Sequence, residues 1–289
     1  MSIVYLNGAF MPEEEAAISP LDRGFIFGDG VYEVIPVYNG HLFRIAEHLQ
    51  RLDTSLKGVR ITQPCSHGQW TAILHELIER NGGGNQSLYL QITRGVARRD
   101  HAFPVDIEPT VFAMSSPLVP LTEEIRRNGV AAVTLHDNRW ENCHLKTIAL
   151  LPNILLRQQA LDAGGSEAIL IRQGEVTEGA ASNLFMVEQG NIVTPPKGPC
   201  LLPGITRDLI VELAQANDIP VQERTITPAQ LAAADEIWLT SSTKEIVPVT
   251  RLDGEAVGKG VPGPLWRQMT ERFQAYKAHY SELEAGDPS

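Results

Sequence analysis

Cys143-His144-Leu145-Lys146-Thr147-Ile148 places a lysine just before an apolar run that is predicted to be helical from Ala149 to Leu161. A second stretch, Val176-Thr177-Glu178-Gly179, puts a glutamate beside glycine in a predicted turn. A lysine becomes a nucleophile when desolvation or a neighbouring cation removes its proton near neutral pH, and the apolar neighbours of Lys146 are consistent with burial. From the residues alone, a solvated lysine and a locally hydrogen-bonded glutamate remain the alternatives.

Leu202-Pro203-Gly204-Ile205-Thr206-Arg207-Asp208 predicts an anion site. Glycine before a helix start leaves backbone N–H groups accessible, and the helix dipole adds partial positive charge. The hydroxyl of Thr206 is predicted to cap this helix, and a simple capped helix is the alternative. Thr240-Ser241-Ser242-Thr243, just after a predicted strand, offers further hydroxyl and amide donors, although loops rich in serine and threonine are common.

Composition narrows the class of protein. The 289 residues are 43% hydrophobic and 20% charged, which is typical of a globular protein large enough for two domains. We expect no signal peptide, because no basic region precedes an apolar run, and no apolar stretch approaches the roughly 20 residues of a membrane-spanning helix. Cys65, Cys143 and Cys200 are odd in number and far apart, which argues against a disulfide framework and favours the cytoplasm.

Charge and motif spacing exclude other functions. The net charge is −11 and the basic residues are scattered, so nucleic acid is not an expected partner. The eight histidines and three cysteines show no metal-ligand spacing, so no metal is expected. The sequence also lacks a Walker loop, a dinucleotide fingerprint and a serine elbow.

The pattern of apolar residues and turns predicts an α+β protein with mostly antiparallel sheets and flanking helices. Asn7-Gly8 and Asn39-Gly40 each lie between apolar runs and predict tight hairpins. Ser116 to Thr122 is punctuated by proline, and a domain boundary is predicted there, between residues 1–119 and 120–289.

Three charged residues are not selected by periodicity. Arg51 falls opposite the apolar stripe of the helix predicted over Glu47 to Lys57, where solvent is the expectation. Arg99 and His101 lie in a loop between predicted strands, where solvation is again the expectation.

The chain resembles the class IV (fold type IV) aminotransferases, which use pyridoxal 5'-phosphate, and within them the D-amino acid aminotransferases. Asp22-Arg23-Gly24 through Phe27-Gly28-Asp29-Gly30-Val31-Tyr32-Glu33 looks like the family's N-terminal signature, and Val176 to Gly179 and Gly204 to Arg207 are similar to its two most recognisable motifs. The resemblance covers nearly the whole chain. It implies a two-domain fold type IV architecture, with a smaller N-terminal α/β domain and a larger C-terminal cofactor-binding domain.

The resemblance implies a role for each candidate residue. Lys146 aligns with the catalytic lysine that forms the Schiff base, Glu178 with the partner of the pyridine nitrogen, and Leu202 with the residue packed against the ring. The implied phosphate cradle consists of Arg51, Ile205, Thr206, Ser241, Ser242 and Thr243. The implied trap for the substrate carboxylate consists of Tyr32, Arg99 and His101. In the family the arginine and histidine come from a second subunit, which implies a homodimer.

The implied activity is ping-pong transamination between D-amino acids, of the D-alanine or D-glutamate type, and 2-oxo acids. Branched-chain transaminases, (R)-amine transaminases and aminodeoxychorismate lyases share the fold and remain alternatives, as does a non-catalytic binder. The Arg99 and His101 pair favours the D-amino acid branch, because branched-chain aminotransferases and aminodeoxychorismate lyases usually lack it. One departure from the family pattern concerns Ala180 and Ala181, which stand where close D-amino acid aminotransferases tend to have serines after the glutamate motif.

Overall fold

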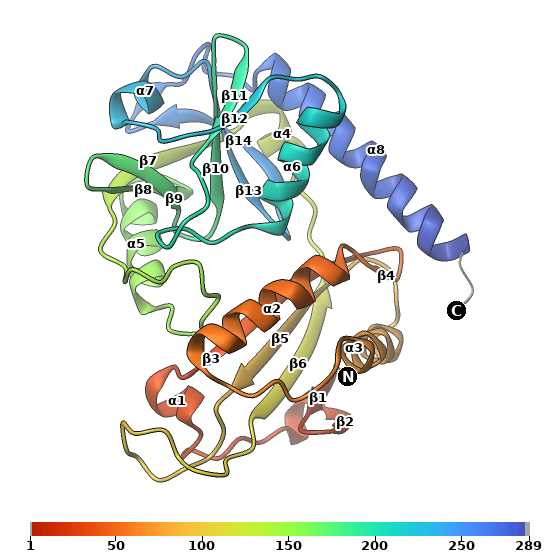
Figure 1. Cartoon of the computed structure of the whole chain (residues 1–289). Helices are drawn as coiled ribbons and strands as arrows, with labels where there is room; N and C mark the ends of the chain where they lie inside the picture. The colour runs from red at the N-terminus through yellow and green to blue at the C-terminus, as the bar shows by residue number, and fades with distance from the viewer. Residues whose placement is uncertain (1, 287–289) are drawn as a thin grey trace. The chain divides into compact units, whose positions relative to one another are not determined.

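The computed structural model describes residues 2–286 and divides the chain into two compact units (Figure 1). Unit 1 comprises Met1–Val119, Leu145–Leu150 and His279–Ser289. Unit 2 comprises Pro120–His144 and Leu151–Ala278. The short segment around Lys146 therefore belongs to unit 1, although the chain on both sides of it belongs to unit 2.

Unit 1 is built on a six-stranded antiparallel sheet with the order β2-β1-β6-β5-β3-β4. Its strands are β1 (Ile3–Leu6), β2 (Ala9–Pro12), β3 (Gly30–Tyr38), β4 (His41–Leu42), β5 (Gln86–Thr93) and β6 (Thr110–Pro117). Its helices are the 3-10 helix η1 (Glu13–Glu15) and the α-helices α1 (Arg23–Phe27), α2 (Ile45–Val59) and α3 (His67–Arg80). Both Asn-Gly hairpins are confirmed, since Asn7 and Asn39 adopt the positive φ of 47° and 52° that these turns require.

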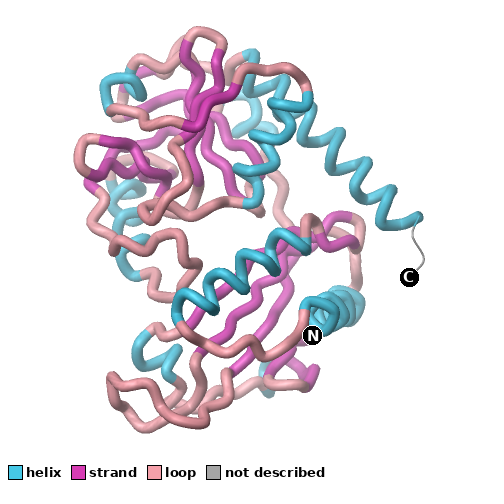
Figure 2. The backbone as a smooth tube through the Cα atoms, viewed as in Figure 1, coloured by secondary structure: helices cyan, strands magenta, loops and turns pink. Residues whose placement is uncertain are grey.

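Helices α2 and α3 supply the apolar side of the unit 1 core. Figure 2 shows α2 lying over the strands of this sheet. Leu49, Leu52 and Leu56 of α2 are fully buried, and they pack with Trp70 and Leu74 of α3 against the sheet. Ser66 begins α3 with a capping box to Gln69.

Unit 2 contains a nine-stranded sheet with the order β12-β11-β10-β13-β14-β7-β8-β9, and β15 pairs with β14. The strands are β7 (Val130–His136), β8 (Glu167–Arg172), β9 (Glu175–Gly179), β10 (Asn183–Glu188), β11 (Asn191–Thr194), β12 (Val221–Glu223), β13 (Glu236–Ser241), β14 (Glu245–Leu252) and β15 (Glu255–Ala256). Three pairings are parallel, β11 with β12, β14 with β7 and β7 with β8, and the others are antiparallel. The prediction of mostly antiparallel sheets is therefore confirmed.

Five helices accompany the second sheet. They are α4 (Glu123–Asn128), α5 (Leu151–Asp162), α6 (Ile205–Ala216), α7 (Pro228–Ala232) and α8 (Pro264–Gly286). Leu156 and Ala160 of α5 are buried against Ala168 and Leu170 of β8. None of the helices in residues 2–286 combines the length and apolarity that a bilayer crossing requires.

The predicted start of α5 at Ala149 is wrong by two residues. Ile148 donates its N–H to the carbonyl of Gly30, and Thr147 forms a bridge with Val31. These contacts hold the segment extended beside β3. The helix begins only at Leu151, directly before Pro152, where the missing N–H of proline costs no helical hydrogen bond.

Candidate active site

Lys146 is fixed by β3 and α2 of unit 1. The N–H of Tyr32 donates to the carbonyl of Lys146 at 2.9 Å. The N–H of Lys146 donates to Oγ of Ser55 at 3.1 Å. Its side-chain Nζ lies 4.2 Å from the centroid of the Tyr32 ring. Backbone and amine are therefore both oriented, and the structure brings Tyr32 and Lys146 together.

Arg51 takes part in a buried ion cluster, so the expectation of solvent exposure is wrong. Its Nε and Nη2 donate to the two carboxylate oxygens of Glu33 at 2.8 and 2.7 Å. Nδ1 of His48 lies 2.8 Å from the same carboxylate. His48, Arg51 and Ser55 recur at helical spacing and form a buried polar stripe next to the leucine stripe of α2. Periodicity missed this stripe because its partner, Glu33, comes from another element.

Opposing effects set the ionisation of this cluster. Burial disfavours the charged form of Glu33, but the Arg51 guanidinium and the His48 hydrogen bond outweigh it and lower the pKa to about 2. Burial lowers the pKa of His48, although Glu33 acts in the opposite direction. A charged Glu33–Arg51 pair thus lies one helical turn from Ser55, which holds the backbone of Lys146.

We expect Glu33→Gln to destabilise the protein by about 3–5 kcal/mol at pH 7, because it leaves the Arg51 cation buried without its counter-ion. A folded-state pKa lowered from 4.5 to about 2 contributes stability above pH 4.5 that is lost as the pH falls through that window, on the order of 3 kcal/mol. Urea unfolding at a series of pH values measures both effects. Asp137 also loses its charge in this pH range in both proteins, so the unfolding free energy of the variant still depends on pH. The slope against pH should nevertheless be shallower in Glu33→Gln than in wild type. Glu76→Gln, which breaks only an exposed pair with Arg80, is the control. Equal slopes in wild type and Glu33→Gln would contradict the assignment.

Arg99 and His101 lie in the loop between β5 and β6, against the end of α1. The Cζ atom of Arg99 is 5.4 Å from the centroid of the Phe27 ring, and the His101 ring centroid is also 5.4 Å from it. Within the part of the chain that the structure describes, no hydrogen bond or ring contact links Arg99 or His101 to Tyr32 or Lys146.

Glu178 ends a hydrogen-bond network in unit 2. One carboxylate oxygen accepts from Nη1 of Arg139 at 2.7 Å. The other accepts from Nδ2 of Asn183 at 3.1 Å and from the N–H of Leu202 at 3.0 Å. Burial raises the pKa of Glu178 to about 7, although Arg139 and the Leu202 amide favour the charged form. The carboxylate is thus oriented by three donors and retains lone pairs for a further donor.

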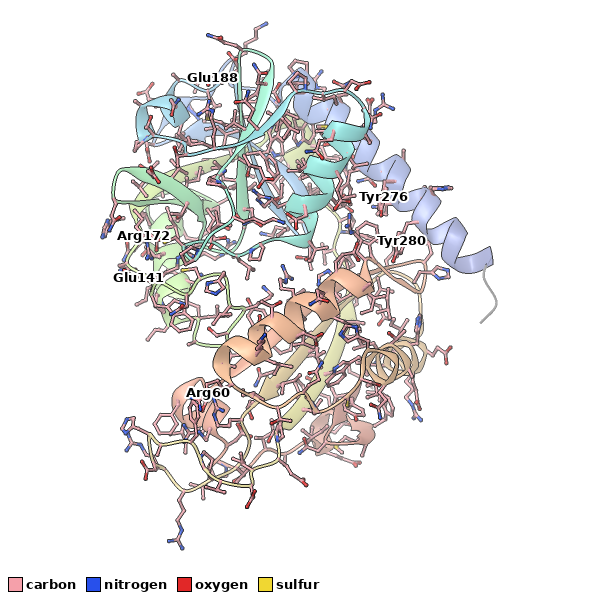
Figure 3. All side chains as sticks on the ribbon, in the orientation of Figure 1. Arg60, Glu141, Arg172, Glu188, Tyr276 and Tyr280 are labelled. Atoms are coloured by element: carbon pink, nitrogen blue, oxygen red, sulfur yellow. The ribbon has the colours of Figure 1, made fainter. Side chains whose placement is uncertain are left out.

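Sequence reasoning missed the residues that hold Glu178. Asp137 binds Nε and Nη2 of Arg139 at 2.9 and 3.0 Å, and Nε of Arg172 lies 3.3 Å from it. Burial opposes ionisation of Asp137, but Arg139 and Arg172 lower its pKa to about 2. Figure 3 labels Arg172 at the end of β8. The signal in the sequence was an aspartate and an arginine two positions apart, directly after the strand β7.

Gly204 is the N-cap of α6, so the prediction that Thr206 caps this helix is wrong. A Cβ atom at Gly204 would lie 1.9 Å from Oδ1 of Asn183, so a larger residue at the cap would displace the Asn183 side chain. The helix begins at Ile205, and Thr206 lies in its first turn. N–H groups of a first turn have no partner within the helix, so Ile205 and Thr206 present donors at the positive end of the dipole.

Ser241, Ser242 and Thr243 lie at the end of β13 and in the turn that leads into β14. Asn183 pairs with Thr240 in the sheet, and its side chain touches Gly204, so the turn and the start of α6 are neighbours. The buried Oγ1 of Thr240 makes no hydrogen bond to any described residue. A phosphate ester fits this arrangement of amide and hydroxyl donors. Leu202 lies two residues before Gly204; its N–H donates to Glu178 and its carbonyl accepts from Nδ2 of Asn183.

Comparison with known proteins identifies the family of the chain. Residues 30–252 match the family model described as amino-transferase class IV. The chain is 41% identical over 271 residues to a D-alanine aminotransferase of Bacillus licheniformis, which covers 94% of this chain and 95% of that protein. A D-alanine aminotransferase of Staphylococcus haemolyticus is 38% identical over 277 residues, covering 96% and 98%.

Solved structures share the fold. A branched-chain amino acid aminotransferase from Escherichia coli superposes with a TM-score of 0.88 at 28% identity, covering 94% of this chain and 92% of that chain. The T.th. branched-chain amino acid aminotransferase, solved with pyridoxamine 5'-phosphate, has a TM-score of 0.86 at 29% identity, covering 93% and 92%. The chain therefore belongs to the class IV aminotransferases, a family of pyridoxal-phosphate-dependent enzymes.

Proposed function

We propose that the protein transfers amino groups between D-amino acids and 2-oxo acids. The observation that carries the cofactor assignment is the Glu178 carboxylate, buried yet held by Arg139, Asn183 and the Leu202 amide. Similarity to D-alanine aminotransferases over nearly the whole chain supports the D-amino acid class. Pyridoxal phosphate, when bound, supplies an electron sink that no side chain offers.

In this proposal, the residues of the chain bind the cofactor and transfer the proton. Nζ of Lys146 would hold the cofactor, and the free amine of the same residue would move the proton from the substrate Cα. The Glu178 carboxylate accepts the ring N–H and favours its protonated form. The phosphate is bound at the start of α6 by Ile205 and Thr206. Arg51 and the turn of Ser241, Ser242 and Thr243 complete the proposed phosphate site, and Leu202 packs against the ring.

Tyr32, Arg99 and His101 bind the substrate carboxylate in this proposal. Arg99 and His101 do not contact Tyr32 within one chain, which supports their donation to the site of a second subunit in a homodimer. A bidentate arginine fixes the orientation of a carboxylate as well as attracting it. With the carboxylate fixed by this group and the departing α-hydrogen directed at Lys146, the side chain has one place left, so only one enantiomer reacts. Similarity to D-alanine aminotransferases supports the D enantiomer.

A cytoplasmic location belongs to the same proposal, because Cys65, Cys143 and Cys200 are all free thiols. Residues 120–289 are proposed to act as the main cofactor-binding domain. Ala180 and Ala181 follow Glu178 and Gly179 in the chain. Ala180 is buried and accepts a hydrogen bond from Asn153, so its methyl group adds to the packing of α5.

A panel of amino donors with 2-oxoglutarate tests the activity. We expect D-alanine or D-glutamate to convert the holoenzyme's cofactor spectrum and to support turnover, and L-leucine to be a poor donor. Preference for L-leucine would indicate a branched-chain transaminase, and preference for an (R)-amine would indicate an amine transaminase. Release of pyruvate from aminodeoxychorismate would indicate the lyase. Absence of any spectral change with D-amino acids would contradict the proposal.

A further inference from the structure

The aromatic ring of Phe27 contacts three charged or polar side chains. It is the last residue of α1 and is half-buried. Arg99 and His101 contact its ring, each at 5.4 Å from the ring centroid. Cζ of Arg23 lies 4.8 Å from the same centroid. The ring therefore touches the two residues proposed to bind the substrate carboxylate from this loop.

Arg23 ties the backbone of the same loop to α1. Its guanidinium is buried, and Nη1 donates to the carbonyls of Asp100 and Ala102 at 2.6 and 3.4 Å, on either side of His101. Its Nε donates to Asp29 at 2.8 Å. The loop between β5 and β6 is thus anchored beside Phe27 by a buried cation whose counter-ion also comes from the N-terminal signature.

A second buried cation, Arg94, lies at the start of the loop and contacts its middle. Arg94 binds the Asp29 carboxylate through Nε and Nη2 at 2.8 and 2.9 Å, and its Cζ lies 3.7 Å from the centroid of the Phe103 ring. It also donates to the carbonyl of Arg60, which Figure 3 labels just past the end of α2. At Gly95, where φ is +108°, a Cβ atom would lie 2.0 Å from the carbonyl of Glu108, so the two ends of the loop meet at van der Waals distance. Its backbone is therefore restrained at several points, and the orientation of Arg99 and His101 depends on their side-chain contacts.

We propose that Phe27 is a positioning residue that holds Arg99 and His101 ready to bind the substrate carboxylate. The inference rests on the proposed function and adds a residue to it. A long side chain loses rotamer freedom when it binds, and a contact that orders it beforehand reduces that cost. Cation–π contact contributes about 0.5–2 kcal/mol, so losing it should weaken carboxylate binding by about tenfold.

Phe27→Leu in the holoenzyme tests the proposal, with Phe27→Tyr as the conservative variant. We expect Phe27→Leu to raise the KM for D-alanine and the inhibition constant of propionate about tenfold. The turnover number at saturation and the dissociation constant of pyridoxal phosphate should stay near wild type, and Phe27→Tyr should retain wild-type values. Phe10→Leu is the matched control, because the Phe10 ring also lies under an arginine, Arg80 at 4.7 Å, on β2.

A double-mutant cycle separates positioning from a general loss of stability. In the Arg99→Ala/His101→Ala background, Phe27→Leu should leave the inhibition constant of propionate unchanged, because the residues it positions are gone. An equal effect in both backgrounds would overturn the inference, as would an unchanged KM in Phe27→Leu alone. If the wild-type enzyme does not use D-amino acids, the proposed function fails. If it uses them and Phe27→Leu behaves as wild type, only the role of Phe27 fails.

Discussion

Lys146→Ala should lower kcat by about 10²–10⁴-fold, because the variant loses the base that moves the Cα proton. The substitution removes the amine that lies against the Tyr32 ring, on a backbone that the Ser55 hydroxyl holds in place. Steady-state turnover of D-alanine with 2-oxoglutarate measures the effect. Added primary amines should restore part of the rate, since a free amine replaces the missing proton acceptor.

The same residue should carry the cofactor covalently. Borohydride reduction of the holoenzyme followed by peptide mapping should place the adduct on Lys146 and remove it in Lys146→Ala. Lys57→Ala is the matched control, because Lys57 is exposed on α2, the helix that also supplies Ser55. A label on another lysine, or a Lys146→Ala enzyme with wild-type turnover, would contradict the assigned role.

The parts of the fold that could be predicted from sequence are those fixed by local chemistry. The hairpins at Asn7-Gly8 and Asn39-Gly40 follow from the positive φ that asparagine and glycine adopt readily. The lysine, glutamate and glycine motifs also identified the family, because their order and spacing are read directly from the chain. None of these inferences requires knowledge of what lies far away in sequence.

The residues that could not be predicted depend on long-range partners. Arg51 is buried because Glu33 of β3 faces it, and helical periodicity contains no information about that strand. Arg139 belongs to the site because β9 places Glu178 within hydrogen-bonding distance of it. The helix cap at Gly204 depends on Asn183, which comes from β10. In each case the residue depends on a polar partner from another helix or strand. That pairing is a property of the tertiary structure and cannot be read from the local sequence.

Glu178→Gln should lower kcat by roughly 10²-fold, because an amide cannot act as counter-ion to a protonated ring nitrogen. The substitution also removes one of the two carboxylates that pair with Arg139, which keeps only Asp137. The near-isosteric amide keeps the shape of the site, so a comparable loss should not come from packing. Glu175→Gln is the matched control, since Glu175 is exposed on the same strand. Turnover of D-alanine and the absorption spectrum of the bound cofactor measure the effect. A rate within a few-fold of wild type would exclude the role of Glu178 as partner of the ring.

The pH dependence of the unliganded protein gives a second readout for the same residue. Burial raises the pKa of Glu178 from 4.5 to about 7, so between these values the folded protein binds more protons at this site than the unfolded chain. Stability contributed by this site therefore falls as the pH rises through that window. Glu178→Gln cannot titrate, and its unfolding free energy should lack this decrease, whereas Glu175→Gln should retain it. If the three proteins share one pH profile between 4.5 and 7, the pKa of Glu178 is not raised by burial in the absence of cofactor. Its preference for a ring N–H must then arise from hydrogen-bond geometry alone.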